Sequence, residues 1–346
     1  MTAFRPPLSG ARRTPRSPAA PRAPRRPLHG VLLLDKPLGW SSNDALQKAK
    51  GILRAEKGGH TGTLDPLATG LLPLCFGAAT KFSQISLDAD KRYLATLKLG
   101  VTTTTADAEG EVIEQRDVTV TRAQVEAACA QLTGPIRQIP PMHSALKRDG
   151  KALYEYARAG IEVEREARSV TIHGIVITGG EHDTWTLDVR CSKGTYIRTL
   201  AEDIGRLLGC GAHLSALRRT GSGALTLEGA LTLDALAAMT EAERDAALQG
   251  ADALVADWPM VRLGTEDAGR FLTGVRRRTA LPDAPHVRVY GPAPQAAPGA
   301  DGPCVFLGGA HIAAGELIST RLLSPVEVQG LLPRALNSRE AKAATP

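Results

Sequence analysis

The chain has 346 residues, enough for one large domain or two ordinary ones with a substantial core. No apolar run approaches the roughly 18 residues of a membrane span, and the N-terminus lacks the apolar segment of a secretory signal. We therefore expect a soluble, cytoplasmic protein. Its five cysteines are scattered, without metal-ligand spacing or a CxxC pair, which predicts reduced and mostly buried thiols.

The net charge of +6 is concentrated at the N-terminus. Residues 1–27 hold seven of the 42 basic residues and no acid, so 35 basic residues face 36 acidic ones in the remainder. Seven prolines in this segment prevent a helix and predict a disordered tail. Any contact of the folded part with a polyanion must then come from local patches, although each patch alone is typical of a solvated face. The candidates are Lys147-Arg148 with Lys151, Arg218-Arg219, and Arg276-Arg277-Arg278.

The first half of the chain alternates predicted strands and helices. GVLLLDKP (30–37) is an apolar strand that ends in a turn, and SSNDALQKAKGILR (41–54) has apolar residues at helical spacing after a Ser/Asn cap. We interpret the glycine-rich stretch 58–81 as a loop. KRYLATLKLG (91–100) alternates as a strand, and residues 121–134 predict a helix with a Thr121/Gln124 capping box and a stop at Gly134.

The second half is richer in strands. Residues 169–209 predict two strands joined by a glycine-rich turn, then a tight turn at 192–194 and a helix that opens near Arg198. After Trp258, a short helix (265–272) and β-like pieces at 286–291, 304–309 and 316–323 predict a small β-rich domain, interrupted by a loop at 291–303. Because strands and helices mix without βαβ regularity, we expect an α+β fold rather than a doubly wound sheet.

One carboxylate, Asp65, is isolated within GGHTGTLDPLATGLLPLCFGAATK (58–81). An unpartnered ionised carboxylate is costly in apolar surroundings, so it is either satisfied by neighbours or kept for chemistry. Pro66 biases it toward an extended conformation, and the surrounding glycines permit close approach of a backbone or a ligand. Asp before Pro is also a common turn former, and a lone loop histidine such as His60 is often structural, so the pattern by itself leaves both interpretations open.

The absence of partners near Asp65 narrows its chemistry. Glycoside hydrolysis needs two opposed carboxyl groups, and metal hydrolysis needs a ligand cluster; neither is visible locally, although a distant acid could fold beside Asp65. Nucleophilic catalysis or electrostatic stabilisation remains, and requires the carboxylate to be ionised and aimed. GTYIRT offers Arg198 as a partner at the end of a strand, with Tyr196 on the same face if the strand continues.

The stretch GGHTGTLDPLATGLLPL resembles the signature of the TruB family of bacterial tRNA pseudouridine synthases, which isomerise the uridine at position 55 in the TΨC loop. Six further stretches resemble family blocks in family order between about His29 and Thr220, with a weaker continuation beyond. They are LLLDKPLGWSS, ATKFSQ, DKRYLATLKLG, TADAEG, IPPMHSALKRDGKALYEYARAG and CSKGTYIRTLAEDIG. In the fifth block, His143 stands where many relatives have tyrosine.

The resemblance implies roles for individual residues. Asp65 matches the catalytic nucleophile, and His60 the residue that fills the space vacated by the flipped base. Tyr93 matches the aromatic that stacks on the extruded uracil and is a candidate for proton abstraction from C5. Arg198 matches the basic partner of the aspartate, and Tyr196 its neighbour in the pocket wall. Positions that line the uridine and RNA-binding surfaces are matched by Lys36, Lys81, Asp107 and Leu217.

The resemblance also implies an architecture: a catalytic domain (28–255) built on a mixed, largely antiparallel sheet flanked by helices, a PUA-like RNA-binding domain (256–326) and a C-terminal tail (327–346). The isomerisation consumes no redox equivalent and needs no metal, so we expect no cofactor. We expect a monomer that acts on the T stem-loop of tRNA without an obligatory protein partner, a guide RNA or a membrane. The alternatives are a non-catalytic RNA-binding or tRNA-folding factor on the same scaffold, and a hydrolase that uses Asp65.

Overall fold

The computed structural model describes residues 24–293 and 303–332. The predicted N-terminal tail, the loop at 291–303 and the C-terminal tail thus lie largely outside the described residues. Within the described part of the chain, no helix combines the length and the hydropathy needed to cross a bilayer.

The main body is built on one nine-stranded sheet, counted over the described residues. Its strands follow the order β1-β3-β12-β4-β11-β10-β7, with β2 paired to β3 and β13 to β12. Every pairing is antiparallel except that of β12 with β3, which confirms the expected mixed, largely antiparallel sheet. The strands are β1 (Gly30–Lys36), β2 (Gly58–His60), β3 (Ala68–Phe76), β4 (Lys91–Leu99), β7 (Gly134–Gln138), β10 (Arg168–Glu181), β11 (Thr184–Cys191), β12 (Ala212–Ser222) and β13 (Leu225–Thr226).

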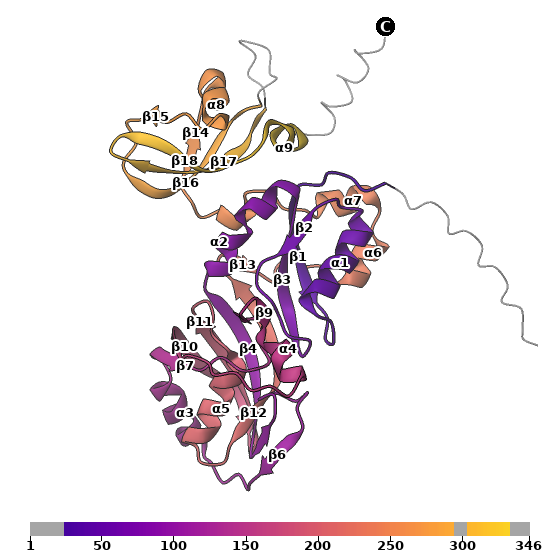
Figure 1. Ribbon diagram of the computed structural model, residues 1–346, viewed down its shortest axis with the longest axis vertical. Coiled ribbons are helices and arrows are strands. Elements are labelled where there is room, and N and C mark those ends of the chain that lie inside the picture. The colour runs from indigo at the N-terminus through magenta and orange to yellow at the C-terminus, as the bar shows by residue number, and fades with distance from the viewer. Residues whose placement is uncertain (1–23, 294–302, 333–346) are drawn as a thin grey trace, which may run out of the picture.

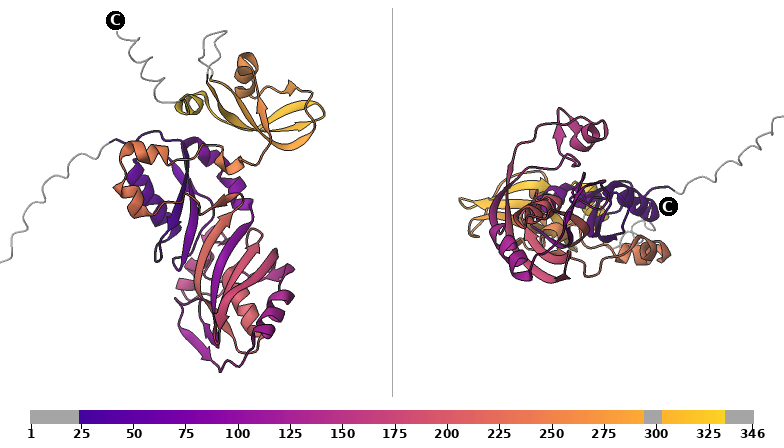
Figure 2. Two further views of the ribbon diagram at one scale, coloured as in Figure 1. Left: turned by 180° about the vertical axis from the view of Figure 1, so that it is seen from behind. Right: turned by 90° about the horizontal axis from the view of Figure 1, so that it is seen from below.

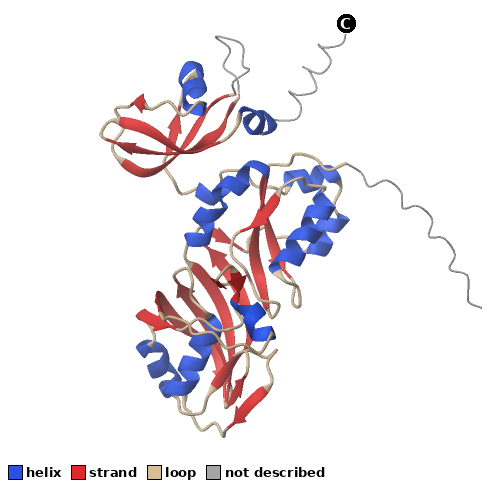
Figure 3. Ribbon diagram, in the orientation of Figure 1, coloured by secondary structure: helices blue, strands red, loops and turns tan. Residues whose placement is uncertain are grey.

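Helices cover the two ends of this sheet (Figures 1 and 3). Helix α5 packs mainly on β12 and also on β4, and α3 packs on β10 and α5, while α6 packs on β1 and α1 packs on β2 and α6; all four helices contribute to the same hydrophobic cluster. A capping box of Thr121 and Gln124 begins α3, as predicted. The helices of the body are α1 (Ser42–Leu53), η1 (Gly77–Phe82), α2 (Ser83–Asp88), α3 (Arg122–Gln131), α4 (Leu153–Arg158), α5 (Ile197–Leu207), α6 (Leu233–Ala238), α7 (Glu241–Ala246) and η2 (Ala253–Val255).

Two small hairpins extend from the body. One is formed by β5 (Val101–Thr103) and β6 (Val112–Gln115), and the other by β8 (Lys147–Arg148) and β9 (Lys151–Ala152). The second hairpin leads into α4. This helix, magenta in the right-hand view of Figure 2, stands away from the sheet.

The C-terminal domain is β-rich, as expected. Its five-stranded sheet has the order β14-β16-β17-β18-β15, and the predicted helix 265–272 is present with the expected bounds. Helix α9 spans the expected boundary at residue 326. The elements are β14 (Met260–Arg262), α8 (Thr265–Leu272), β15 (Arg277–Arg278), β16 (Ala284–Pro292), β17 (Cys304–Ala313), β18 (Glu316–Leu322) and α9 (Pro325–Gly330).

The core has two hydrophobic clusters, and the second of them joins the two domains. Val31 and Leu33 of β1 point into it from one face of the main sheet, whereas Leu32 and Leu34 point into the cluster under α1. The second cluster continues through Phe82, whose ring centroid lies 5.1 Å from that of Phe306 in β17. The C-terminal domain is therefore packed against the body through a shared core.

Phe82→Ala is expected to destabilise the whole chain by about 3–5 kcal/mol, because the fully buried ring leaves a cavity in the shared core. Urea unfolding should show one transition shifted to lower denaturant. The matched control is Ile113→Ala on β6, where the side chain is 65% exposed and the change should stay within about 0.5 kcal/mol. A separate early transition confined to the C-terminal domain, with the body unaffected, would contradict the shared core.

Two local expectations were wrong. The stretch 68–76, expected to be part of a loop, is strand β3; both of its faces are buried, so it lacks the alternation typical of a strand. Arg198 does not end a strand: β11 stops at Cys191, Gly194 has φ +77°, and Arg198 is the second residue of α5. The helix expected to open near Arg198 is confirmed.

Candidate active site

Asp65 lies in the loop between β2 and β3 (residues 61–67, the Asp65 loop), which is held by its neighbours. Ser42, the first residue of α1, accepts a hydrogen bond from the Leu64 amide at 2.7 Å and donates to the Leu64 carbonyl at 3.0 Å. The Gly39 amide donates to the Pro66 carbonyl at 2.9 Å. The amide of Ala68 donates to the Asp65 carbonyl at 3.0 Å, which closes a turn. The loop is thus fixed on both sides of Asp65.

Asp65 meets Arg198 as predicted. A terminal nitrogen of Arg198 lies 2.9 Å from Asp65 Oδ2, where the Asp65 side chain is 43% exposed and that of Arg198 only 5%. The guanidinium also donates to the backbone carbonyls of Thr105 at 3.1 Å and His143 at 2.6 Å. A carboxylate that faces solvent is therefore paired with a buried cation of fixed orientation.

A second acid, Asp107, lies behind Arg198. Its Oδ2 is 3.6 Å from Arg198 Nε, and its side chain is 4% exposed. Its Oδ1 accepts hydrogen bonds from Thr105 Oγ1 at 2.5 Å and from the Glu109 amide at 3.1 Å. Asp107 is thus the distant acid that folds close to Asp65, but its oxygens are engaged by Arg198 and its own turn. This arrangement does not provide the two opposed carboxyl groups of a glycoside hydrolase.

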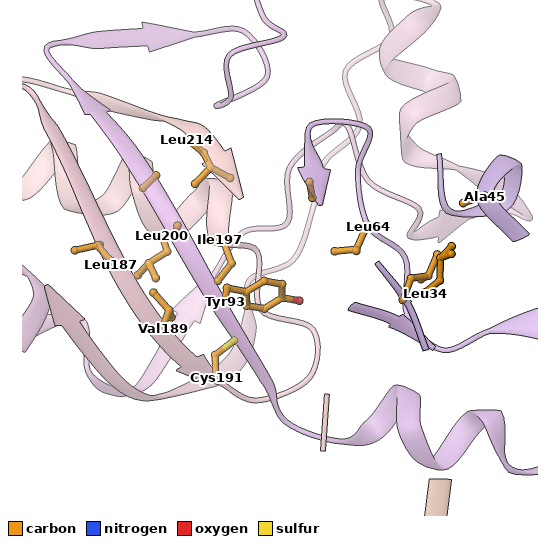
Figure 4. Packing of buried hydrophobic residues seen from close by; sticks show 14 of the residues in the cluster. Leu34, Ala45, Leu64, Tyr93, Leu187, Val189, Cys191, Ile197, Leu200 and Leu214 are labelled. Carbon is orange, nitrogen blue, oxygen red and sulfur yellow. The ribbon is translucent and has the colours of Figure 1, made fainter. Parts of the chain in front are cut away.

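A cavity of about 340 Å³ opens beside Asp65. Five of the nine predicted site residues line it: Asp65, Tyr93, Tyr196, Arg198 and Leu217. Figure 4 shows the Tyr93 ring extending from β4 toward Leu64, with Ile197 and Cys191 nearby. Burial raises the pKa of the Tyr93 hydroxyl, and the Arg219 guanidinium opposes that rise.

The other four predicted residues do not line this cavity. Asp107 is the acid behind Arg198. His60, on β2, is half-buried; its Nδ1 has no hydrogen-bond partner among the described residues, and burial lowers its pKa. Lys36 is buried at the end of β1, where its Nζ donates to the carbonyls of Pro37 and Trp40 at 2.9 and 2.6 Å. Lys81 contacts the C-terminal domain through Glu327 at 2.6 Å.

Burial lowers the pKa of Lys36 to about 8 from 10.5, although Asp65 acts in the opposite direction. Between pH 8 and 10.5 the unfolded chain therefore binds more protons at this site than the folded one, so raising the pH through this window favours folding. We expect the stability of the wild type, relative to Lys36→Met, to rise by about 1.4 kcal/mol per pH unit there. Urea unfolding of both proteins across the window tests this, and a pH-independent difference contradicts it. Titrating thiols are common to both proteins and cancel.

Similarity to known proteins agrees with this geometry. Residues 50–197 match the family described as "TruB family pseudouridylate synthase (N terminal domain)", and residues 198–256 match "tRNA pseudouridylate synthase B C-terminal domain". A protein of Ralstonia nicotianae named tRNA pseudouridine synthase B is 63% identical over 270 residues, covering 76% of this chain and 86% of its own length. The chain belongs to the TruB family. A Verminephrobacter eiseniae member of the same name is 56% identical over 88% of this chain and 92% of its own.

Solved structures extend the TruB likeness at the level of the fold. A chain in the crystal structure of a Cbf5-Nop10-Gar1 complex aligns with a TM-score of 0.64 at 25% identity, covering 87% of this chain and 86% of its own. A chain of the archaeal box H/ACA sRNP Nop10-Cbf5 complex aligns with a TM-score of 0.62 at 23% identity, with 86% of each chain covered. These likenesses agree with the expected pseudouridine synthase fold.

Lys91 and Gln138 at this TruB family site were not predicted, and Arg219 was predicted only as part of a surface patch. Arg219 and Lys91 line the cavity, and both are buried. The Gln138 side chain holds the backbone of Tyr196 through two hydrogen bonds, at 3.0 and 3.3 Å. The expectation of a surface patch at Arg218-Arg219 was wrong, because adjacent residues of β12 point to opposite faces: Arg219 is buried, and Arg218 pairs with Asp35.

Proposed function

We propose that this chain converts uridine 55 of tRNA to pseudouridine, the activity that the name of its curated relatives and the TruB family imply. The observation that carries the proposal is one carboxylate, Asp65, at a cavity wall, 2.9 Å from the buried Arg198. The cavity of about 340 Å³ is in the size range of small-molecule sites, as a single extruded base requires.

In the proposed mechanism, Arg198 keeps Asp65 ionised and aimed. Asp65 attacks the ribose C1′, attacks the base, or abstracts a ribose proton to give a glycal. The N1–C1′ bond breaks and a C5–C1′ bond forms, C5 loses its proton and N1 gains one, so the composition is unchanged. Tyr93, buried in the cavity wall, stacks on the uracil and is the candidate to take the C5 proton; because burial favours the neutral phenol, it must release its own proton in the same step.

The surroundings of the cavity offer contacts for RNA. Residues 144–146 line the cavity, and the exposed hairpin that follows carries Lys147, Arg148 and Lys151, which suit phosphate contacts. In this proposal, His60 takes the place of the departed base. Lys36, buried at the end of β1, acts on Asp65 electrostatically and does not touch the nucleotide. Lys81 contributes by holding α9 rather than by touching the nucleotide. The protein acts as a monomer, without a guide RNA or partner protein.

The direct test is incubation of the purified protein with an unmodified tRNA transcript, followed by chemical mapping of pseudouridine. Modification at position 55 alone is the expected result, and a transcript with cytidine at that position is the matched control. If the wild type leaves position 55 unmodified while it binds the transcript, the isomerase proposal fails and a non-catalytic RNA-binding role takes its place.

A further inference from the structure

Arg219 lies on β12, between β3 and β4 in the sheet, and has no role in the mechanism above. It lies directly opposite Tyr93 of β4 on one side and Gly70 of β3 on the other. Its side chain is among the largest that are fully buried, with 1% exposure. Its neighbour Arg218 points away and forms a bidentate ion pair with Asp35 at 3.0 and 2.7 Å.

The guanidinium of Arg219 spans the base of the Asp65 loop. Nε donates to the Leu71 carbonyl at 2.7 Å, and a terminal nitrogen donates to the Gly62 carbonyl at 3.2 Å. Gly62 enters the loop and Leu71 follows its exit into β3. One side chain thereby joins the entry of the loop to its exit, and Asp65 lies between the two attachment points.

Two glycines of the Asp65 region make room for Arg219. Gly62 has φ +86°, and a Cβ placed there would lie 3.3 Å from Arg219 Nη1. Gly70 has φ +97°, and a Cβ placed there would overlap the Arg219 backbone. The glycines that made this stretch look like an open loop instead allow the loop to close tightly on one arginine.

The guanidinium of Arg219 forms no ion pair with a carboxylate among the described residues, whereas that of Arg198 forms two. Burying an unpaired cation costs several kcal/mol, and a neutral side chain would fill the space without that cost. The charge of Arg219 changes the pKa of two site residues. It adds to the effect of burial that lowers the pKa of His60, and it opposes the effect of burial that raises the pKa of Tyr93.

We propose that Arg219 is a positioning residue for the reaction, which fixes the Asp65 loop by bridging the Gly62 and Leu71 carbonyls and holds the Tyr93 side of the cavity in register with it. The proposal rests on the proposed isomerase function. It explains why a buried cation without a carboxylate partner lies between the strand that carries Tyr93 and the loop that carries Asp65.

The test compares full-length Arg219→Met and Arg219→Lys with the wild type. Single-turnover release of the C5 hydrogen from tRNA labelled at uridine C5 measures the chemical step, and anisotropy measures affinity for the tRNA. We expect both variants to lose about 10²-fold in single-turnover rate, because a small displacement of a catalytic group costs that much, with affinity changed less than about threefold. Lysine retains the charge but cannot bridge both carbonyls.

Amide hydrogen exchange supplies a readout that does not depend on turnover. In both variants, exchange should accelerate across residues 61–71 and remain as in the wild type across β10 and β11. The matched control, Arg92→Met, removes an arginine from the outward face of β4, next to Tyr93, and should leave rate and exchange unchanged; Arg92 is 57% exposed and pairs with Asp188.

Three outcomes would overturn the proposal: full turnover by Arg219→Lys, acceleration of exchange throughout the sheet, or unchanged exchange at 61–71. If Arg219→Met does not fold, Arg219→Lys decides alone. Failure of the isomerase function itself is distinguishable, because the wild type would then release no label while the exchange comparison still reports on the loop.

Discussion

Asp65→Asn is expected to abolish pseudouridine formation, with a loss of at least roughly 10⁴-fold in single-turnover rate, the scale seen when a residue of the catalytic machinery is removed. Asparagine retains the shape of the side chain and a hydrogen bond to Arg198, but it is neither an effective nucleophile nor a base. The affinity for tRNA should stay within several-fold of the wild type, because one residue of a large interface is changed.

The matched control for this prediction is Asp117→Asn, which neutralises an exposed carboxylate outside the cavity and should leave turnover intact. Chemical mapping at position 55 and an anisotropy titration measure the two quantities. Wild-type turnover by Asp65→Asn would mean that another group attacks the uridine and that Asp65 is a structural turn residue.

Arg198→Met is expected to lower both turnover and stability. Loss of the cation beside Asp65 should reduce single-turnover rate by about 10²–10³-fold, as for other electrostatic groups in active sites. The buried Asp107 would also lose its cation, which should cost about 3–5 kcal/mol in the free energy of unfolding.

The double variant Arg198→Met/Asp107→Asn separates these effects. Neutralising Asp107 removes the stranded charge, so stability should recover much of its loss while turnover stays low. Urea unfolding and single-turnover assays on the same preparations measure both. Full stability of the single variant, or full turnover of the double variant, would contradict the assigned roles.

Sequence reasoning reached much of this fold because its signals are local. Helix α3 has a capping box, α8 has the expected bounds, and β16, β17 and β18 match the three β-like pieces that predicted them, whereas β14 and β15 were not predicted. The strand β3 was missed for a tertiary reason. Its Leu71 and Cys75 contact the C-terminal domain side, and Leu72 and Leu74 contact the α1 side, so no polar face remained to reveal the alternation.

Some residues of the candidate site could be predicted from the sequence, and others depend on tertiary contacts. Resemblance to family motifs placed Asp65, Arg198 and Tyr93, and the structure brings these together at one cavity. Resemblance could not tell that Lys81 pairs with Glu327, because that contact depends on how this C-terminal domain packs. Nor could it rank Arg219, whose importance follows from bonds to two segments that are distant from it in sequence.

The core that runs unbroken from β1 through Phe82 to Phe306 sets a fixed span between the cavity and the outer face of the C-terminal domain. If, under the proposed function, an RNA contacts both places, this span sets the distance between the contact on the C-terminal domain and the nucleotide at Asp65. RNAs that differ in the length or curvature of their stem would then bind differently without any contact to a base.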